Sequence, residues 1–139
     1  MEPDASSIDI VKRLYAAIER RDFAKVEAML ADDFIVDAPA GQAVVGGRYE
    51  GRAAAIRGLW GRLVESWEDL TPHIQEYVAQ DATVLTLGHY SGKSRETGRT
   101  LQADFAHVWH VDGSRIDKLK IVTDTHRWNM AWGRAPEST

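Results

Sequence analysis

The second half of the chain constrains the fold most, because it consists of long strand-like segments joined by short turns. The segments cover 72–79, 82–91, 99–111 and 115–125, and turn residues such as the Asp-Gly pair at 112–113 separate them. An Asp-Gly pair favours a tight hairpin, since glycine adopts positive φ at little steric cost. Successive strands with such short connections pair antiparallel. We therefore predict an antiparallel meander that forms a strongly curved sheet.

The N-terminal part of the chain predicts a hairpin of two short amphipathic helices. Apolar residues recur there at the i, i+3, i+4 and i+7 spacing of one helix face, with charged residues on the other face. Ser6 or Ser7 can cap the first helix by accepting a hydrogen bond from an unpaired backbone N–H, and Asp22 can cap the second. Neither helix can bury its apolar face alone, so both must pack against another element.

The segment between the hairpin and the meander predicts a strand, a loop and a third helix. The order is a short strand at 34–36, a Gly-rich loop at 41–51 with at most one short strand at 43–45, and a helix at about 52–67. Gly58 and Gly61 weaken this helix, because each glycine costs about 1 kcal/mol relative to alanine. The same two glycines, beside Trp60, can let the helix lie close against a flat group.

The order of helices first and strands second places the chain in the α+β class. We predict three N-terminal helices packed on a strongly curved antiparallel sheet. The length of 139 residues fits a single domain over 1–139, with a structured core over about 7–130. A chain of this length can bury enough surface for a core and an internal cavity.

Composition argues against several classes of function. The 17 Lys and Arg residues against 21 Asp and Glu residues give a net charge of −4, which argues against a nucleic-acid partner. The absence of cysteine removes disulfides, thiolate catalysis and Cys-ligated zinc, and it fits a reducing compartment. No apolar run approaches the roughly 18 residues that span a bilayer, and the N-terminus lacks the pattern of a signal peptide. We expect a cytoplasmic protein with no membrane partner.

Short motifs follow one another in a defined order over about residues 8–128. They are Asp22-Phe23, Leu30-Ala31-Asp32-Asp33-Phe34, Tyr49-x-Gly51-Arg52-x-x-x-Ile56, Thr97-Gly98-Arg99, Phe105-Ala106-His107-Val108-Trp109, Asp112-Gly113 and Asp124-Thr125. The motifs of the first half resemble the nuclear transport factor 2-like superfamily, and those of the second half resemble its SnoaL-like branch. Each motif is short, but their order and spacing together are specific.

The resemblance implies a cone-shaped fold, the cystatin-like roll, in which a curved sheet wraps around a deep and mostly apolar cavity. Many members dimerise through the outer face of the sheet, so the resemblance also implies a homodimer. The superfamily includes steroid isomerases, polyketide cyclases, epoxide hydrolases, dehydratases and proteins without catalysis. A shared fold therefore does not determine the reaction, and the site must be tested residue by residue.

The catalytic residues of the steroid isomerases are missing at the corresponding positions of this sequence. By resemblance, its proton-moving carboxylate, its tyrosine and its protonated carboxyl fall at Ala38, Leu14 and Ala106. Asp37 and Tyr15 lie one residue away, and an offset of one residue turns a strand side chain to the opposite face. The Asp–Arg–Asp set of the epoxide hydrolases is absent as well. A cyclase mechanism stays open, because it needs only one pocket acid with a shifted pKa.

Asp104 is the candidate catalytic residue. Strand alternation places it on one face with Gln102, Ala106 and Val108, and the resemblance turns that face inward. An acid in an apolar cavity loses hydration, which raises its pKa and suits it to acid–base chemistry. The alternative is a carboxylate at the mouth of the cavity that binds a neighbouring group or water.

Aromatic and polar side chains are expected around the same cavity. Trp60 on the third helix, Tyr90 on a strand and Tyr15 beside the stripe of the first helix are candidates for the pocket wall, and plain core positions are the alternative. Asp124 and His126, two residues apart on the last strand, could form a carboxylate–imidazole pair or only a structural hydrogen bond.

The remaining candidates are an acid, an aromatic strand face and the histidines. Asp37 could face the cavity or cap the Gly-rich loop. Phe105, His107 and Trp109 share the strand face opposite the candidate acid, and we predict that they form the dimer interface, because exposed apolar sheet needs cover. For His107, a role as general base is the alternative. The five histidines show no metal-ligand spacing, since His107 and His110 point to opposite faces of one strand, and we expect no metal and no cofactor.

These observations predict a small soluble homodimer that binds a small, largely apolar organic molecule. If the protein is an enzyme, we expect cofactor-free proton-transfer or hydration chemistry of the isomerase, cyclase or lyase type. The alternative is a non-catalytic binding or dimerisation module, because the sequence contains none of the complete catalytic sets considered above.

Overall fold

The structure, a computed structural model, describes the backbone of residues 3–133 and the side chains of residues 7–133. The helical elements are α1 (Pro3–Glu19), α2 (Phe23–Met29), α3 (Arg52–Ala55), the π-helical segment η1 (Ile56–Trp60), α4 (Gly61–Ser66) and α5 (Thr125–Trp132). The strands are β1 (Leu30–Ala38), β2 (Gly47–Glu50), β3 (Trp67–Gln80), β4 (Thr83–Ser94), β5 (Thr100–Asp112) and β6 (Arg115–Thr123). None of the described helices is long and apolar enough to cross a membrane.

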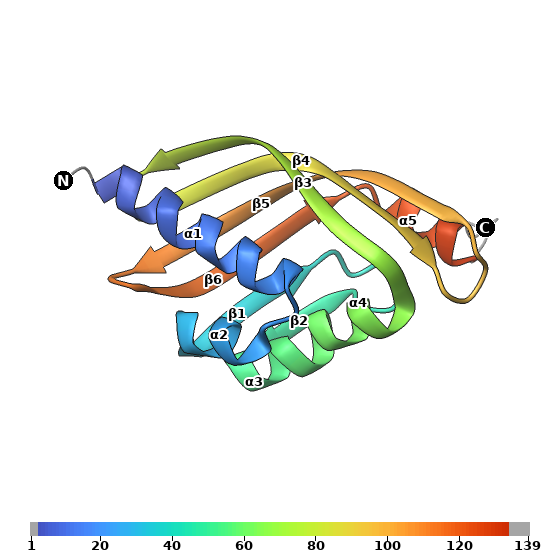
Figure 1. Cartoon of the computed structure of the whole chain (residues 1–139), viewed down its shortest axis with the longest axis horizontal. Helices are drawn as coiled ribbons and strands as arrows, with labels where there is room; N and C mark the ends of the chain where they lie inside the picture. Colours follow the sequence, from blue (N-terminus) through green and yellow to red (C-terminus); the bar gives the residue numbers. More distant parts are fainter. Residues whose placement is uncertain (1–2, 134–139) are drawn as a thin grey trace.

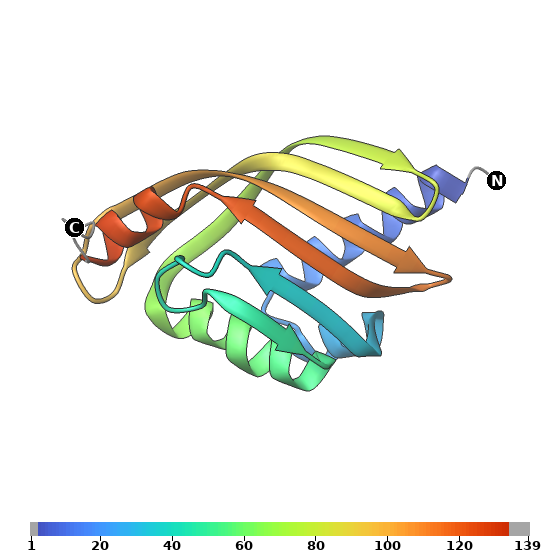
Figure 2. The ribbon, with the colours of Figure 1, turned by 180° about the vertical axis from the view of Figure 1, so that it is seen from behind.

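A single curved sheet forms the main layer, with the strand order β2-β1-β6-β5-β4-β3. Its neighbouring strands run antiparallel except β1 and β6, which pair parallel, so the predicted antiparallel sheet contains one parallel pair. Helices α1 to α4 lie on one face of the sheet, and the view from behind looks onto the other face (Figures 1 and 2). The structure confirms the α+β class and the curved cystatin-like roll, with α5 as an additional helix.

The N-terminal helical hairpin forms as predicted, but it starts earlier. Helix α1 begins at Pro3 rather than at Ser6 or Ser7. Proline is tolerated in the first turn, because the N–H that it lacks would have no helical partner there. The side chain of Asp22 accepts a hydrogen bond from the backbone N–H of Lys25 at 3.2 Å, which confirms the predicted cap of α2.

The third helical segment is continuous over 52–66, but its middle is a π-helix. This π segment contains Gly58, where a Cβ atom would lie 2.7 Å from Cε2 of the Tyr49 ring. The Tyr49 hydroxyl donates a hydrogen bond to the backbone carbonyl of Val45 at 2.7 Å, which holds the ring in place. The predicted close approach to a flat group is therefore confirmed at Gly58.

A glycine in β4 lets β3 bend across it. A Cβ atom at Gly88 would lie 2.0 Å from the backbone carbonyl oxygen of His73, so a larger residue requires a backbone shift. The β3–β4 ladder shifts register between Ile74 and Glu76, which marks a β-bulge or irregularity. A bulge bends its strand and increases the twist, and here it contributes to the curvature that encloses the interior.

Several elements differ from the prediction. Strand β1 spans Leu30–Ala38 rather than 34–36, and β3 begins at Trp67 rather than at 72. The short strand after β1 is β2 rather than 43–45, and it pairs with β1. The last strand does not reach Asp124, whose side chain instead caps α5 by accepting a hydrogen bond from the backbone N–H of Arg127 at 3.3 Å. Gly133 ends α5 in the left-handed conformation, with φ 102°, as is common after helices. The strand-like alternation of Asp124 and His126 conceals this helix in the sequence.

The inward face of β5 is the opposite of the predicted one. Phe105, His107 and Trp109 have exposed fractions of 4%, 4% and 1%, whereas Asp104 is exposed. The predictions that Asp104 faces the cavity and that the three rings form a dimer interface are therefore wrong. The reason is the hydrophobic effect, since the helices cover the face whose larger rings bury more apolar area.

Candidate functional site

A pocket extends from the surface into the core between the α1–α2 turn, the third helical segment and the sheet. Its free volume is about 60 Å³. Because one water needs roughly 10–15 Å³ of free volume, the pocket has room for several waters. The lining is mostly apolar, as is typical of sites for organic ligands. It consists of Tyr15, Ile18, Arg21, Phe23, Leu59, Trp60, Leu63, Val64, Leu70, Pro72, Tyr90, His107, Trp109, Leu119 and Ile121.

Three predicted pocket residues lie in this lining, namely Tyr15, Trp60 and Tyr90. Trp60 is 7% exposed and stacks on Phe34 with ring centroids 6.0 Å apart. The π-helical segment positions Trp60, and such segments occur often at functional sites. Trp60 therefore offers a supported aromatic wall to a flat ligand.

A buried polar cluster lies at the deep end of the pocket, with His107 at its centre. Nδ1 of His107 lies 2.6 Å from the Tyr15 hydroxyl, and Nε2 lies 2.5 Å from the Tyr90 hydroxyl. The Tyr15 hydroxyl also lies 2.7 Å from Oγ1 of Thr86 and accepts a hydrogen bond from Nε1 of Trp109 at 3.0 Å. We call Tyr15, His107 and Tyr90 the Tyr–His–Tyr cluster.

The sheet register and the packing of α1 assemble this cluster. Thr86 on β4 lies directly opposite His107 on β5, and Tyr90 follows Thr86 on the same inward strand face. Helix α1 packs across β3 and β4 and brings the Tyr15 hydroxyl to the imidazole. Both ring nitrogens of His107 are thereby satisfied, as the burial of a polar side chain requires.

Burial sets the charge state of the cluster. It lowers the pKa of His107 to about 3, because a buried imidazolium loses its hydration. Burial also raises the pKa of Tyr90 well above its usual value. It raises the pKa of Tyr15 as well, since the loss of hydration outweighs the hydrogen bonds from Thr86 and Trp109. Near neutral pH the cluster therefore consists of a neutral imidazole between two protonated phenols.

A neutral cluster has two hydrogen-bond arrangements, because a neutral imidazole carries only one N–H. When Nε2 of His107 donates to Tyr90, Tyr15 donates to Nδ1, and the hydroxyl hydrogen of Tyr90 is free for a ligand. When Nδ1 donates to Tyr15, Tyr90 donates to Nε2 and offers a ligand only its oxygen lone pair. Tyr90 can therefore act as donor or as acceptor toward the pocket.

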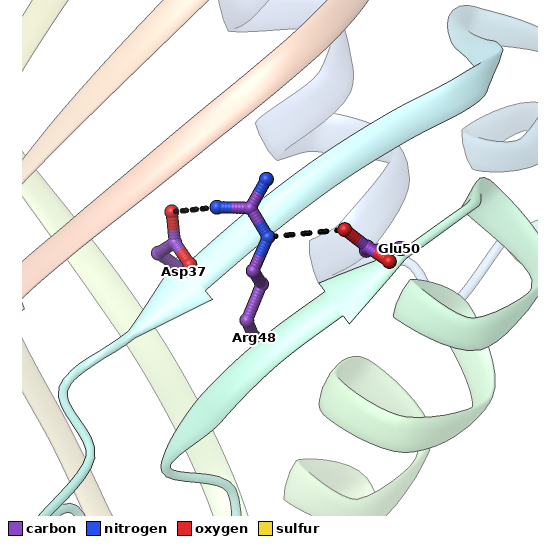
Figure 3. A network of polar contacts seen from close by, with 3 residues as sticks. All are labelled: Asp37, Arg48 and Glu50. Atoms are coloured by element: carbon purple, nitrogen blue, oxygen red, sulfur yellow. Dashed lines mark hydrogen bonds and ion pairs between the residues drawn. The ribbon is translucent and has the colours of Figure 1, made fainter.

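Asp37 lies on β1 but outside the pocket. Its carboxylate, 40% exposed, pairs with Nη1 of Arg48 at 3.4 Å, and Nε of Arg48 contacts Glu50 at 3.3 Å (Figure 3). The next residue, Ala38, is buried on the inward face, as strand alternation requires. The prediction that Asp37 faces the cavity is wrong, and its ion pair instead links β1 to β2.

The other three predicted polar residues also lie outside the pocket. Asp104 is exposed on the outer face of β5, directly opposite His89 of β4. Asp124 caps α5 and pairs with Nε of Arg127 at 3.6 Å, while His126 is exposed on the same helix. A shared strand face that would pair Asp124 with His126 does not exist, because a helix begins between them.

Two polar residues of the lining and the cluster were not singled out from the sequence, Thr86 and Arg21. Thr86 shares the strand face of Tyr90, so alternation alone could have identified it. Arg21 lies in the turn after α1, where no periodic pattern operates. For His107 the available signal was its position between Phe105 and Trp109, whose large rings mark the face that the core buries.

The polar groups at the deep end of the pocket are neutral hydrogen-bond donors and acceptors rather than a carboxylate base. None of the described lining residues is a carboxylate, so the predicted acid–base role of Asp104 has no counterpart in the pocket. Across residues 7–133, no group of three or more His, Cys, Asp or Glu side chains could hold a metal ion. The pocket thus combines apolar walls with a neutral phenol–imidazole–phenol system.

Comparison with known families and structures agrees with this architecture. The profile of the SnoaL-like domain matches residues 11–119. Comparison with curated proteins gives no match. An NTF2-like protein from Burkholderia thailandensis E264 is 31% identical, with a TM-score of 0.84 over 94% of this chain and 98% of that one.

More distant structures share the fold. A putative SnoaL-like polyketide cyclase from Jannaschia sp. CCS1 is 13% identical, with a TM-score of 0.83 over 98% of this chain and 97% of that one. TerC, co-crystallised with polyporic acid, is 19% identical, with a TM-score of 0.81 over 91% of this chain and 98% of that one.

Proposed function

The chain belongs to the SnoaL-like domain family, and from this premise we propose that its pocket binds a small ring-containing organic molecule through an oxygen atom that hydrogen-bonds to Tyr90. The observation that carries the proposal is the Tyr–His–Tyr cluster, which places a buried hydroxyl at the deep end of a mostly apolar pocket. TerC, a protein of the same fold, was co-crystallised with polyporic acid, which supports an organic ligand.

The walls favour a flat and apolar ligand body. Trp60 is stacked on Phe34, so its ring is held in one orientation and can contact a ligand ring without losing further freedom. The free volume of about 60 Å³ favours a single ring over a fused ring system. Burial of one ring in such a pocket contributes most of the binding free energy through the hydrophobic effect.

The polar end favours a ligand oxygen. Because His107 stays neutral, Nε2 can donate to the Tyr90 oxygen and leave the Tyr90 hydrogen for a carbonyl or phenol oxygen. The hydrogen bond from the imidazole polarises the phenol and strengthens its donation. An oxygen-free ring of the same size forgoes this hydrogen bond, whose net contribution is about 0.5–1.5 kcal/mol.

Cofactor-free proton-transfer chemistry is the second candidate function, and the donor at Tyr90 favours it. When a hydroxide ion from solvent takes a proton from the carbon beside a ligand carbonyl, water forms, the C–H electron pair becomes the C=C bond, and the carbonyl π pair moves to the oxygen, which becomes an enolate. A fixed donor at that oxygen stabilises the developing charge. Return of the proton to the same or another carbon completes exchange or isomerisation. The low pKa of His107 makes it a poor acceptor of that proton, so the cluster acts on the oxygen.

Binding is tested with acetophenone and ethylbenzene, which have similar size and differ in the carbonyl oxygen. We expect acetophenone to bind more tightly, by about tenfold, and Tyr90→Phe to remove that difference. The matched control is Tyr49→Phe, which deletes a hydroxyl outside the pocket. Two-dimensional NMR titration measures both affinities, and equal binding of the two probes to the unmodified protein contradicts the proposal.

Catalysis is tested with the same ketone in D₂O. Exchange of the acetophenone methyl protons for deuterium, followed by proton NMR, should exceed the buffer rate with the unmodified protein and with Tyr49→Phe, but not with Tyr90→Phe. Binding without exchange assigns the non-catalytic function to the pocket.

We also propose that the protein forms a homodimer through the outer face of the sheet rather than through the buried face of β5. Val78, Leu85 and Val108 lie side by side on β3, β4 and β5 of that face, and Ala106 pairs with Val122 in an adjacent row. Val78 and Val122 are 46% and 51% exposed. Such a row of apolar side chains on a sheet fits an isologous contact with a second copy.

A further inference from the structure

The mouth of the pocket carries a single formal charge. Among the described lining residues, Arg21 is the only permanently charged side chain, and the one other titratable base, His107, stays neutral in the core. The positive end of the pocket is therefore at its surface, and the neutral hydrogen-bonding end is at its base. A cation beside an apolar cavity that holds no carboxylate creates a positive potential for an incoming ligand.

The backbone and side chain of Arg21 are held in an unusual way. Arg21 adopts φ 60°, a left-handed conformation that L-residues other than Asn and Asp adopt rarely. Its backbone N–H and its Nη1 both donate to the carbonyl of Ile18, at 3.0 Å each, which fixes the guanidinium at the end of α1. The left-handed turn thus carries a long cationic side chain where glycine would fit without strain.

The rest of the guanidinium is available to a ligand. Within residues 7–133, no carboxylate lies within ion-pair distance of Arg21. The carboxylate next in sequence, that of Asp22, accepts the backbone N–H of Lys25 in the cap of α2. A guanidinium presents planar donors that match the two oxygens of a carboxylate.

We propose that the ligand of this pocket is a small aromatic organic acid, with its ring against Trp60 and its carboxylate at Arg21. The inference rests on the proposed function and adds the charge of the ligand to it. The ring enters the apolar interior while the anion stays at the exposed mouth, so the carboxylate need not lose all of its hydration.

The test compares carboxylates with their neutral amides of nearly identical shape: benzoate with benzamide, phenylacetate with phenylacetamide, and 3-phenylpropanoate with its amide. The three acids differ in the number of carbon atoms between the ring and the carboxylate. We expect at least one carboxylate to bind about tenfold more tightly than its amide. Arg21→Gln should remove that preference without changing the affinity for the amide, and Arg21→Lys should restore part of it.

Arg20→Gln is the matched control, because it removes the same charge from the neighbouring exposed residue, which does not line the pocket. It should keep the preference for the carboxylate. Circular dichroism melting checks that each variant is folded, since Arg21 also binds the end of α1.

The outcomes separate the two proposals. If acid and amide bind equally in every pair, the role of Arg21 is contradicted while the pocket proposal stands. The same holds if Arg20→Gln and Arg21→Gln lose the preference for the carboxylate to the same extent. If neither the acids, the amides nor acetophenone bind, the pocket proposal fails and this inference fails with it.

Discussion

His107 shows how one residue can be polar, buried and uncharged at the same time. Each of its ring nitrogens faces a tyrosine hydroxyl, so the neutral form satisfies its hydrogen bonds without any charge. The protonated form would need a compensating anion, and none of the described pocket-lining residues is one. The fold therefore stabilises the neutral imidazole specifically. This preference makes the free energy of unfolding depend on pH.

Stability should fall on mild acidification because of His107. Burial lowers its pKa to about 3 in the folded protein, against 6.5 for the free side chain, so the unfolded chain binds the additional proton between these values. The free energy of unfolding should therefore decrease as pH falls below 6.5, by about 2 kcal/mol between pH 7 and pH 5. Urea unfolding at these two pH values measures the loss.

The variant His107→Gln should lose much less stability over the same interval, since an amide does not titrate. The control is His126→Gln, which removes an exposed imidazole of α5 outside the pocket. It should keep the dependence of the unmodified protein. If the free energy of unfolding of His107→Gln falls between pH 7 and pH 5 as much as that of the unmodified protein, other groups cause the acid sensitivity.

At the scale of elements, the π-helical segment links fold and site. It brings Trp60 to the pocket and at the same time sets Gly58 against the ring of Tyr49. An ordinary helix would gain from alanine at an interior glycine, because alanine loses less backbone entropy. Here the gain is opposed by a clash, since Tyr49 is held by its bond to Val45.

Gly58→Ala should therefore destabilise the protein, by about 1–3 kcal/mol, through overpacking against Tyr49. In the background of Tyr49→Ala the same substitution should instead be neutral or stabilise by up to about 1 kcal/mol. Urea unfolding of the four proteins of this double-mutant cycle gives the coupling free energy. A coupling near zero means that the ring does not limit the size of the residue at 58.

In the whole molecule, the two faces of the sheet have different surroundings. Its covered face forms the core and pocket, and its other face carries the row of Val78, Leu85 and Val108 with Val122 beside it. A patch of this kind on an isolated subunit exposes apolar surface to water, and association with a second copy removes that cost.

Val122→Lys should shift a dimer toward the monomer, because it places a charge beside the apolar row of the proposed contact without disturbing the core. Sedimentation equilibrium of the unmodified protein should give twice the chain mass. The control Met130→Lys changes another exposed apolar residue, 41% exposed and located on α5, and should leave the dimer intact. A monomer in the unmodified protein at high micromolar concentration contradicts the proposed interface.

The element types followed from the sequence because they rest on local physics. The spacing of apolar residues predicts the helices, the alternation and turn residues predict the meander, and Asp22 has the side chain that an N-cap needs. The same local logic identified Trp60 and Tyr90 as candidates for the pocket wall, where the structure places them. The end of β6 was missed, since Asp124 fits a strand and a helix cap equally well.

Local patterns in the sequence thus predicted the class of fold, the order of the elements as far as β6 and the presence of aromatic residues for a cavity, but not helix α5. Only the tertiary structure decided which face of β5 turns inward, because alternation defines two faces and both carry apolar residues, such as Trp109 on one and Val108 on the other. That choice moved Asp104 to the surface and brought His107 to Tyr15, 92 positions away in the chain. Contacts at such separation depend on how a helix packs across a curved sheet, and no local pattern of residues contains that information.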